Sequence, residues 1–314
     1  MPRFILHLAT ACLVYMTLVL PASAMPLIWV ALSDESLSYL EAAAVLRDTL
    51  GDRATVKSGR WQTLRAEQTP PPDLLVTIGV EALDGMLERL AGEVAVWPQV
   101  PILAIMVPQV IFEARQATPG LGARALSAVV LDQPPERQLA LIKRALPGRT
   151  RVGILPGSLT NPKLGALRKE AARQQLKLVV GPAVEEPKHI SLSLKAVLEE
   201  SDVILALPDP AVYYGSSLQY ILLTAYRARV PLAAYSQAFV KSGAVLGLYS
   251  TPTQMALRAT EMIHAWQGGR VLQPVQFPRG FIVETNPKVA ASLGLSIDDA
   301  SSITEDLRRL EHSR

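Results

Sequence analysis

Residues 73–91 read DLLVTIGVEALDGMLERLA, and this stretch decides the fold. Its first part, 73–79, is apolar at nearly every position, which predicts a strand whose two faces are both covered. The residues that follow, 80–91, are predicted to form a helix. A buried strand followed directly by a helix is the repeating unit of α/β proteins with parallel sheets.

The same unit recurs along the chain. Further buried strands are predicted at 27–32, 101–106, 126–131, 151–155, 176–180, 202–207, 231–235 and 244–249. Helices are predicted between them, and Ser33 or Asp34 is expected to cap the helix after the first strand. The alternation predicts an α/β fold with parallel sheets, and a break near 132–135 predicts two similar lobes. Ligands of such sheets lie beyond the carboxyl ends of the strands, so the expected site is the cleft between the lobes.

Residues 1–24, MPRFILHLATACLVYMTLVLPASA, have the anatomy of a secretory signal peptide. Arg3 supplies the positive start, an apolar run spans 4–20, and cleavage is predicted after Ala24. A transmembrane anchor is the alternative, because the run is close to spanning length, but the cleavage signal directly after it favours export. A lipoprotein signal at Cys12 fits less well, because the apolar run continues past it. We therefore expect a soluble mature protein in the periplasm, without a membrane span.

The composition excludes several classes of protein. With 49% hydrophobic and 19% charged residues, the chain is expected to be globular rather than disordered. Its net charge is +3, from 31 basic and 28 acidic residues, which is too balanced for a nucleic-acid binder. The one cysteine lies in the predicted signal peptide. The mature chain is therefore expected to form no disulfide and no thiolate metal site.

Enzyme signatures are absent from the mature sequence. His189, His264 and His312 are far apart and form no H-x-x-x-H or H-x-H spacing. The sequence also has no G-x-S-x-G elbow and no phosphate-binding loop of the G-x-x-x-x-G-K-[ST] form. We expect no catalytic residue, no bound metal and no cofactor, and hence no enzymatic activity.

Candidate ligand-binding residues lie in loops that follow predicted strands. They are Ser33, Gly79, Glu81, Ser158, Asp209, Tyr213 and Tyr235. Backbone N–H groups at helix starts can hold a carboxylate, and tyrosines supply an aromatic wall with polar ends. Ordinary turn and capping chemistry is the alternative for each of these residues.

Several motifs together resemble one family. They are LALIKRALPGRTRVGIL at 139–155, DVI at 202–204, VPL at 230–232, VKSGA at 240–244, the helix at 253–268 and VETNPKVAASLGL at 283–295. In order and spacing the chain resembles the ABC-transporter substrate-binding proteins of the tryptophan/tyrosine-uptake type, which are type I periplasmic binding proteins. The resemblance covers nearly the whole mature chain and is clearest from 129 to 297.

The resemblance implies two Rossmann-like lobes with parallel sheets, joined by three hinge crossings. The first lobe would hold 25–131 plus 251–277, and the second 133–249 plus 280–314. It also implies a function as the periplasmic solute-binding component of an ABC importer. The lobes would close around a small molecule, and the closed form would dock on the permease and ATPase complex in the membrane.

Two loops depart from the family pattern. Val80-Glu81-Ala82 replaces a hydroxyl-rich T-P-A-type loop, and Pro208-Asp209-Pro210 replaces a T-D-N-type loop, so that Asp209 alone carries over. Glu81 would repel the carboxylate of an amino acid. The solute is therefore not a standard amino acid, or Glu81 meets its ammonium group, or no small ligand is bound. A sensory or assembly protein of the cell envelope that reuses the fold is the alternative function.

Overall fold

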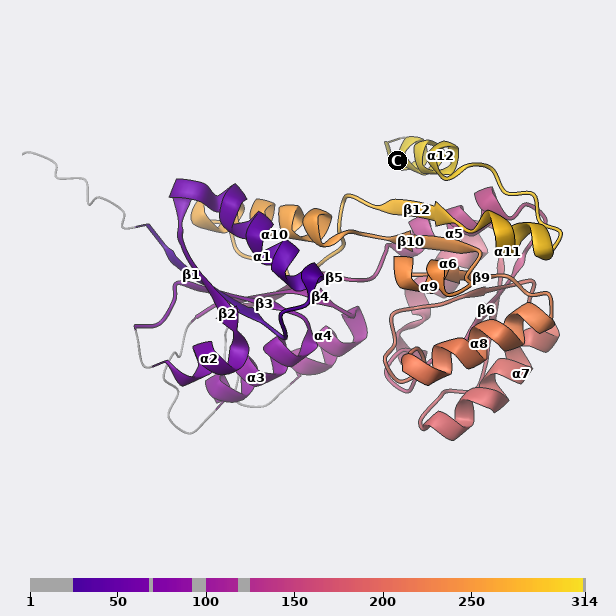
Figure 1. Ribbon diagram of the computed structural model, residues 1–314, viewed down its shortest axis with the longest axis horizontal. Helices are drawn as coiled ribbons and strands as arrows, with labels where there is room; N and C mark the ends of the chain where they lie inside the picture. Colours follow the sequence, from indigo (N-terminus) through magenta and orange to yellow (C-terminus); the bar gives the residue numbers. More distant parts are fainter. Residues whose placement is uncertain (1–24, 68–69, 92–99, 118–124, 313–314) are drawn as a thin grey trace, which may run out of the picture.

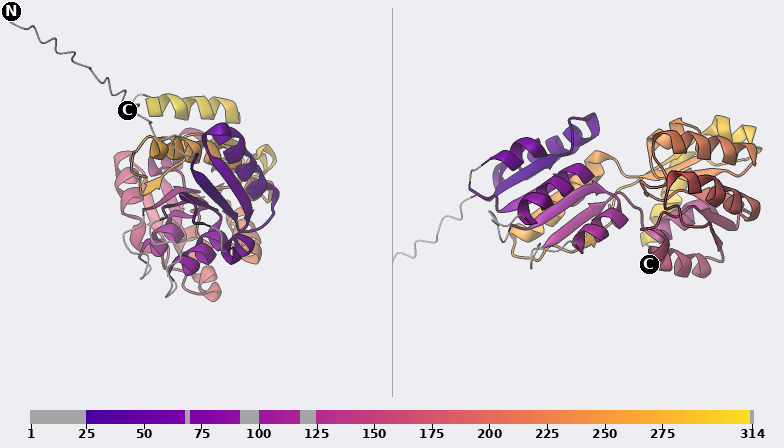
Figure 2. Two further views of the ribbon diagram at one scale, coloured as in Figure 1. Left: turned by 90° about the vertical axis from the view of Figure 1, so that its left-hand side faces the viewer. Right: turned by 90° about the horizontal axis from the view of Figure 1, so that it is seen from below.

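The computed structural model describes residues 25–67, 70–91, 100–117 and 125–312, and they form two lobes that lie side by side (Figures 1 and 2). Each lobe is built on a six-stranded sheet. The strand orders are β11-β5-β4-β3-β1-β2 in the first lobe and β12-β10-β9-β8-β6-β7 in the second. Helices alternate with strands, so the predicted two-lobed α/β fold is confirmed. The predicted signal peptide, residues 1–24, lies outside the described residues.

The first lobe is a fully parallel sheet covered on both faces. Its strands are β1 (Leu27–Leu32), β2 (Thr55–Arg60), β3 (Leu74–Ile78), β4 (Ile102–Val107), β5 (Leu126–Val130) and β11 (Val275–Gln276). Its helices are α1 (Leu37–Leu50), η1 (Gly51–Arg53), α2 (Trp61–Ala66), α3 (Val80–Ala91), α4 (Gln109–Gln116) and α10 (Pro252–Gln267). Along β1, Ile28 and Val30 pack in the core beneath α1 and α10, whereas Trp29 packs in the core beneath α3. This alternation is why β1 reads as an unbroken apolar run.

The second lobe repeats this arrangement. Its strands are β6 (Arg151–Ile154), β7 (Lys177–Val180), β8 (Val203–Leu205), β9 (Leu232–Ala234), β10 (Leu246–Tyr249) and β12 (Ile282–Thr285). Its helices are α5 (Pro135–Ala145), η2 (Asn161–Lys163), α6 (Gly165–Arg173), η3 (Pro187–His189), α7 (Ile190–Glu200), α8 (Gly215–Arg227), α9 (Gln237–Lys241), α11 (Pro287–Ser292) and α12 (Ala300–His312). One core lies beneath α5, α6 and α12, and the other beneath α7 and α8.

Two sequence predictions need correction. The sheets are not parallel throughout, because β12 pairs with β10 in the antiparallel direction. The chain reaches β12 from the other lobe without a crossover helix, and such a helix is what fixes the parallel direction elsewhere. The first helix starts at Leu37 after Ser36, because the Asp34 carboxylate accepts a hydrogen bond from the Ser36 N–H at 2.7 Å and forms a local turn.

The chain passes between the two sheets three times: after β5, between β10 and α10, and between β11 and β12. The three crossings are fastened to one another. Gln133, in the first crossing, donates from Nε2 to the Ser250 hydroxyl in the second at 3.0 Å. Ser250 in turn donates to the Gly280 carbonyl in the third at 2.6 Å. The hinge is therefore a hydrogen-bonded unit, and residues next to it stand in a fixed place between the lobes.

Every helix in the described ranges of the chain is too short or too polar to span a membrane.

Candidate functional site

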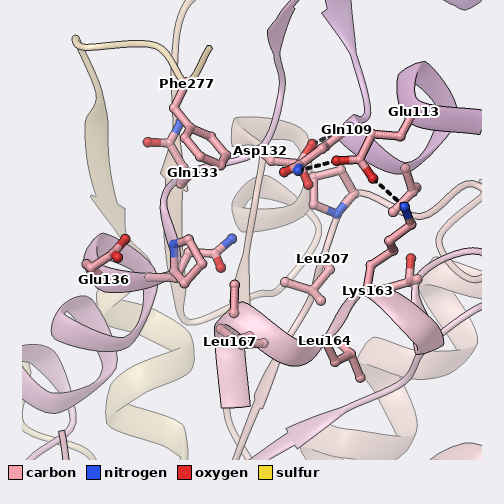
Figure 3. A pocket seen from close by; sticks show the side chains of 16 residues that line it. Gln109, Glu113, Asp132, Gln133, Glu136, Lys163, Leu164, Leu167, Leu207 and Phe277 are labelled. Atoms are coloured by element: carbon pink, nitrogen blue, oxygen red, sulfur yellow. Dashed lines mark hydrogen bonds and ion pairs between the residues drawn. The ribbon is translucent and has the colours of Figure 1, made fainter. Parts of the chain in front are cut away.

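A cavity of about 390 Å³ opens between the lobes beside the hinge (Figure 3). The first lobe contributes Gln109 and Glu113 from α4, and the second contributes Lys163 from η2. The crossings supply Asp132 and Phe277. A volume of this size is at the lower end of pockets that enclose small molecules. Because both lobes and the hinge form its walls, the affinity for a molecule bound here would depend on the relative position of the lobes.

One ion pair spans the cavity from lobe to lobe. The Lys163 Nζ lies 2.9 Å from an oxygen of Glu113, and Gln109 Nε2 donates to the other oxygen at 2.7 Å (Figure 3). Burial opposes ionisation of Glu113, but the hydrogen bonds from Lys163 and Gln109 outweigh it and hold its pKa below the usual value. Glu113 is therefore a carboxylate at neutral pH, and Lys163 is already paired.

Asp132 stands between the lobes in the first crossing. Its Oδ2 accepts a hydrogen bond from the backbone N–H of Gln109, the first residue of α4, at 2.7 Å. Burial raises the pKa of Asp132 to about 7 against this hydrogen bond, and the nearby charges of Glu113 and Asp209 raise it further. Asp132 is thus a half-buried carboxyl that ionises near neutral pH.

Asp209, which the sequence analysis selected, is buried and ties two loops together. Its Oδ2 accepts from the Gly157 N–H at 2.9 Å and from the Thr160 hydroxyl, and its Oδ1 accepts from the Ala211 N–H at 3.0 Å. The loop after β6 is thereby held against the loop after β8. Ser158, next to Gly157, is exposed on the same loop. A direct contact from Asp209 to a ligand stays a prediction.

The two predicted tyrosines form one aromatic cluster with Phe239. The rings of Tyr213 and Tyr235 meet edge to face with centroids 6.0 Å apart, and Phe239 lies 4.7 Å from Tyr235. Burial raises the pKa of both tyrosines, so they stay neutral. Within the described ranges the Tyr213 hydroxyl is sealed from solvent and has no hydrogen-bond partner.

The predicted residues of the first lobe serve the local structure. The Ser33 hydroxyl donates to the Ile78 carbonyl and accepts from the Ala82 N–H, both at 2.9 Å, so it caps the start of α3 from a neighbouring strand. Gly79 has φ +87° and lies against Ser33 and Tyr39. Glu81 is exposed in the first turn of α3.

The Gly79→Ala variant is expected to lose about 2–4 kcal/mol of unfolding free energy. A Cβ at this position would lie 2.6 Å from Ser33 Oγ and 2.7 Å from the Tyr39 hydroxyl, in a backbone conformation that already favours glycine. Gly148→Ala is the matched control, because Gly148 has a similar φ of +85° with open space around it. Urea unfolding followed by circular dichroism measures both. Equal losses would show that the contact with Ser33 and Tyr39 costs nothing.

None of the seven predicted residues lines the hinge-side cavity, but Asp209 lies directly behind its wall, where it accepts a hydrogen bond from the lining residue Thr160. Asp132, Glu113 and Lys163, which line the cavity, were not predicted from the sequence. One signal was present for Asp132: it directly follows a buried strand and precedes Gln-Pro-Pro, the break between the lobes. No sequence pattern links Glu113 to Lys163, since they lie on different lobes. Among the described residues, no three His, Cys, Asp or Glu side chains gather as a metal site would require.

The architecture is that of a binding protein, because a cavity lies between two lobes that three chain crossings connect. The model of the ABC transporter substrate binding protein family matches residues 126–305, more than half of the chain. The protein therefore belongs to this family and is a solute-binding component. Members are non-enzymatic binding proteins and typically periplasmic. No curated protein sequence matches the chain significantly.

Solved structures share the fold. A conserved domain protein from Vibrio cholerae has a TM-score of 0.60 at 20% identity, and the match covers 88% of this chain and 97% of that one. An ABC domain from Streptococcus pneumoniae in complex with L-Trp has a TM-score of 0.60 at 17% identity, covering 89% and 97%. A ligand-free, open substrate-binding protein with adhesive properties from Clostridium difficile has a TM-score of 0.61 at 15% identity, covering 87% and 96%. At these identities the likeness concerns the fold alone.

Proposed function

We propose that this protein binds one small solute between its lobes and delivers it to an ABC permease and ATPase in the membrane. The observation that carries the proposal is the hinge-side cavity, whose walls come from both lobes and from the crossings. A solute that contacts both walls binds the closed form more tightly than the open one, and it shifts the equilibrium by that difference.

The solute is proposed to be amino-acid-like in size. A cavity of about 390 Å³ lies near the lower end of the volume range of small-molecule pockets, which suits a solute of this size. The streptococcal structure contains L-Trp, which belongs to this size class. Tyr213 and Tyr235, with Asp209 beside them, are proposed as a second wall farther along the cleft.

Export and lobe organisation complete the proposal. Residues 1–24 are proposed to direct the chain to the periplasm and to be removed after Ala24. The first lobe is proposed to hold 25–131 plus 251–277, and the second 133–249 plus 280–314. In support, α10 packs on α1, and the Thr260 and Thr49 hydroxyls lie 2.9 Å apart.

A thermal-shift screen of the mature protein tests the proposed function. The panel should contain amino acids, amines, sugars and dicarboxylates. A solute present at a hundred times its dissociation constant is expected to stabilise the protein by about 2.7 kcal/mol, which raises the melting temperature by several degrees. Small-angle scattering of the same sample should show a smaller radius of gyration. If no solute of any class raises the melting temperature, the proposal of a small-molecule transport component is wrong.

A further inference from the structure

The charges of the hinge-side cavity do not balance. Three of its lining residues are acidic, namely Asp132, Glu113 and Glu136, whereas Lys163 is the one basic residue among them. Lys163 is paired with Glu113, so its charge is already compensated. Within the described part of the chain, the hydrogen bonds recorded for the Asp132 carboxyl come from backbone N–H groups. A carboxylate between the lobes therefore lacks a cationic partner.

A second polar group of the cavity also lacks a partner. Gln138, on α5, lines the cavity and is 6% exposed. Across the described ranges, its side-chain amide makes no hydrogen bond to protein. Among the described residues this amide is not one of the polar groups sealed from solvent, so water in the cavity can satisfy it and a ligand can take that water's place. Its carbonyl can accept a hydrogen bond from an ammonium or guanidinium group, as the Asp132 carboxylate can.

The rest of the wall is apolar. Leu164, Leu167, Leu207 and Phe277 line the cavity opposite or beside the acidic groups (Figure 3). These side chains suit the hydrocarbon body of a ligand, and they exclude water from its charged end. Exclusion of water strengthens a pairing between a cation and a carboxylate.

We propose, resting on the proposed function, that the solute is a cation without a carboxylate of its own, an amine or a guanidinium, and that Asp132 binds its charged group. Gln138 supplies a further acceptor, and the leucines with Phe277 hold the apolar body. A ligand carboxylate would meet Glu113, Glu136 and Asp132 in a cavity whose lysine is already paired. The site therefore selects a basic solute over a zwitterionic amino acid, which is a narrower substrate class than the family alone implies.

Agmatine and arginine form the matched pair of probes, since agmatine is arginine without its carboxylate. Phenethylamine and phenylalanine form a second pair with an aromatic body. Isothermal titration of the mature protein at about pH 8, where Asp132 is ionised, is expected to show at least tenfold tighter binding of at least one amine than of its amino acid. Tighter binding of both amino acids, or binding of anionic or uncharged solutes alone, overturns the inference and leaves the proposed function standing.

The Asp132→Asn variant tests the residue itself. The amide oxygen still accepts from the Gln109 N–H, and the buried charge is gone, so the ligand-free variant should melt at the same temperature as the wild type or higher. Its affinity for the amine should fall at least tenfold. Glu185→Gln is the control, because Glu185 is an exposed glutamate of the second lobe that does not line the cavity, and the affinity of this variant should change less than threefold. Unchanged affinity in Asp132→Asn overturns the inference.

The pH dependence of the wild type gives an independent readout if the variant folds poorly. Below about pH 7 a proton competes with the amine for Asp132, so affinity should fall by up to tenfold per pH unit. The other charged or titratable groups near Asp132 are Glu113 on α4, Lys163 on η2, Glu136 on α5, and Asp209 and Tyr235 after β8 and β9. Glu113 has a lowered pKa and Tyr235 a raised one, so neither changes charge near pH 7. Affinity that stays constant from about pH 8 to pH 5.5 would contradict a role for Asp132.

Discussion

The Asp209→Ala variant is expected to lose about 3–5 kcal/mol of unfolding free energy. The substitution leaves two buried donors without their acceptor, the Gly157 N–H and the Thr160 hydroxyl, and also frees the part-buried N–H of Ala211. The cavity it opens lies between the loops after β6 and β8. Asp209→Asn keeps one acceptor oxygen but points an amide N–H₂ at donors, and it should lose about half as much.

The measurement can assign this loss to one lobe. Trp29, Trp61 and Trp266 lie in elements of the first lobe, and the sequence of 133–249 and 280–314 contains no tryptophan. Urea unfolding followed by tryptophan fluorescence thus reports the first lobe, whereas circular dichroism reports both. We expect Asp209→Ala to shift the dichroism transition more than the fluorescence transition. Asp48→Ala, at an exposed aspartate of α1, is the control and should change stability by less than about 0.5 kcal/mol. A loss as small as that of the control would mean that Asp209 does not fasten the loops.

Local burial explains which parts of the fold could be predicted from the sequence. The structure confirms the strand at 27–32 and the helix at 80–91 to the residue. Both could be predicted because the strand is covered on both faces and the helix packs on the sheet, so their apolar residues follow from local burial. β2, which reads TVKSGR, was not predicted. It is an edge strand with no fully buried residue, so its sequence carries no apolar run. β12 was also not predicted. It too is an edge strand, because it lies at the end of the second sheet and pairs with a neighbouring strand on one side only.

The candidate site could be predicted less well, because its properties depend on residues that are distant in sequence. Asp209 was selected as a polar residue after a strand, and the structure places it there. That its oxygens are occupied by Gly157 and Thr160 depends on a loop about fifty residues earlier. The raised pKa of Asp132 likewise arises from burial between two lobes and from the charges of Glu113 and Asp209. Neither environment is visible in the few residues around each aspartate.

The second large effect is expected at Arg137, on the first turn of α5. Its side chain is 5% exposed and lies over the ring of Phe281 at 4.2 Å. The guanidinium donates to Gln133 Oε1 at 2.6 Å, to the Pro278 carbonyl at 3.2 Å and to Glu311 at 2.5 Å. It therefore binds the first and third crossings and the last helix, α12, at one point.

The Arg137→Met variant should lose about 3–5 kcal/mol of unfolding free energy, since it keeps the volume but leaves Glu311 and the acceptors of the hinge without their donor. Arg137→Lys should recover little, because an ammonium group cannot reach acceptors on three sides as a planar guanidinium does. Arg144→Met is the matched control on the same helix: Arg144 pairs with Asp298 and Asp306 at the surface, where solvent screens the pairs, so this variant should lose much less stability than Arg137→Met.

Scattering measurements on Arg137→Met can show whether Arg137 restricts the orientation of the two lobes or only stabilises the second lobe. Because Gln133 links Arg137 to Ser250 and Gly280, loosening it frees all three crossings and widens the range of lobe orientations. Small-angle scattering of folded Arg137→Met, compared with Arg144→Met, should then show a larger radius of gyration without solute. An unchanged radius together with the full loss of stability would mean that Arg137 supports the core of the second lobe and α12, and that the position of the lobes is set by the crossings themselves.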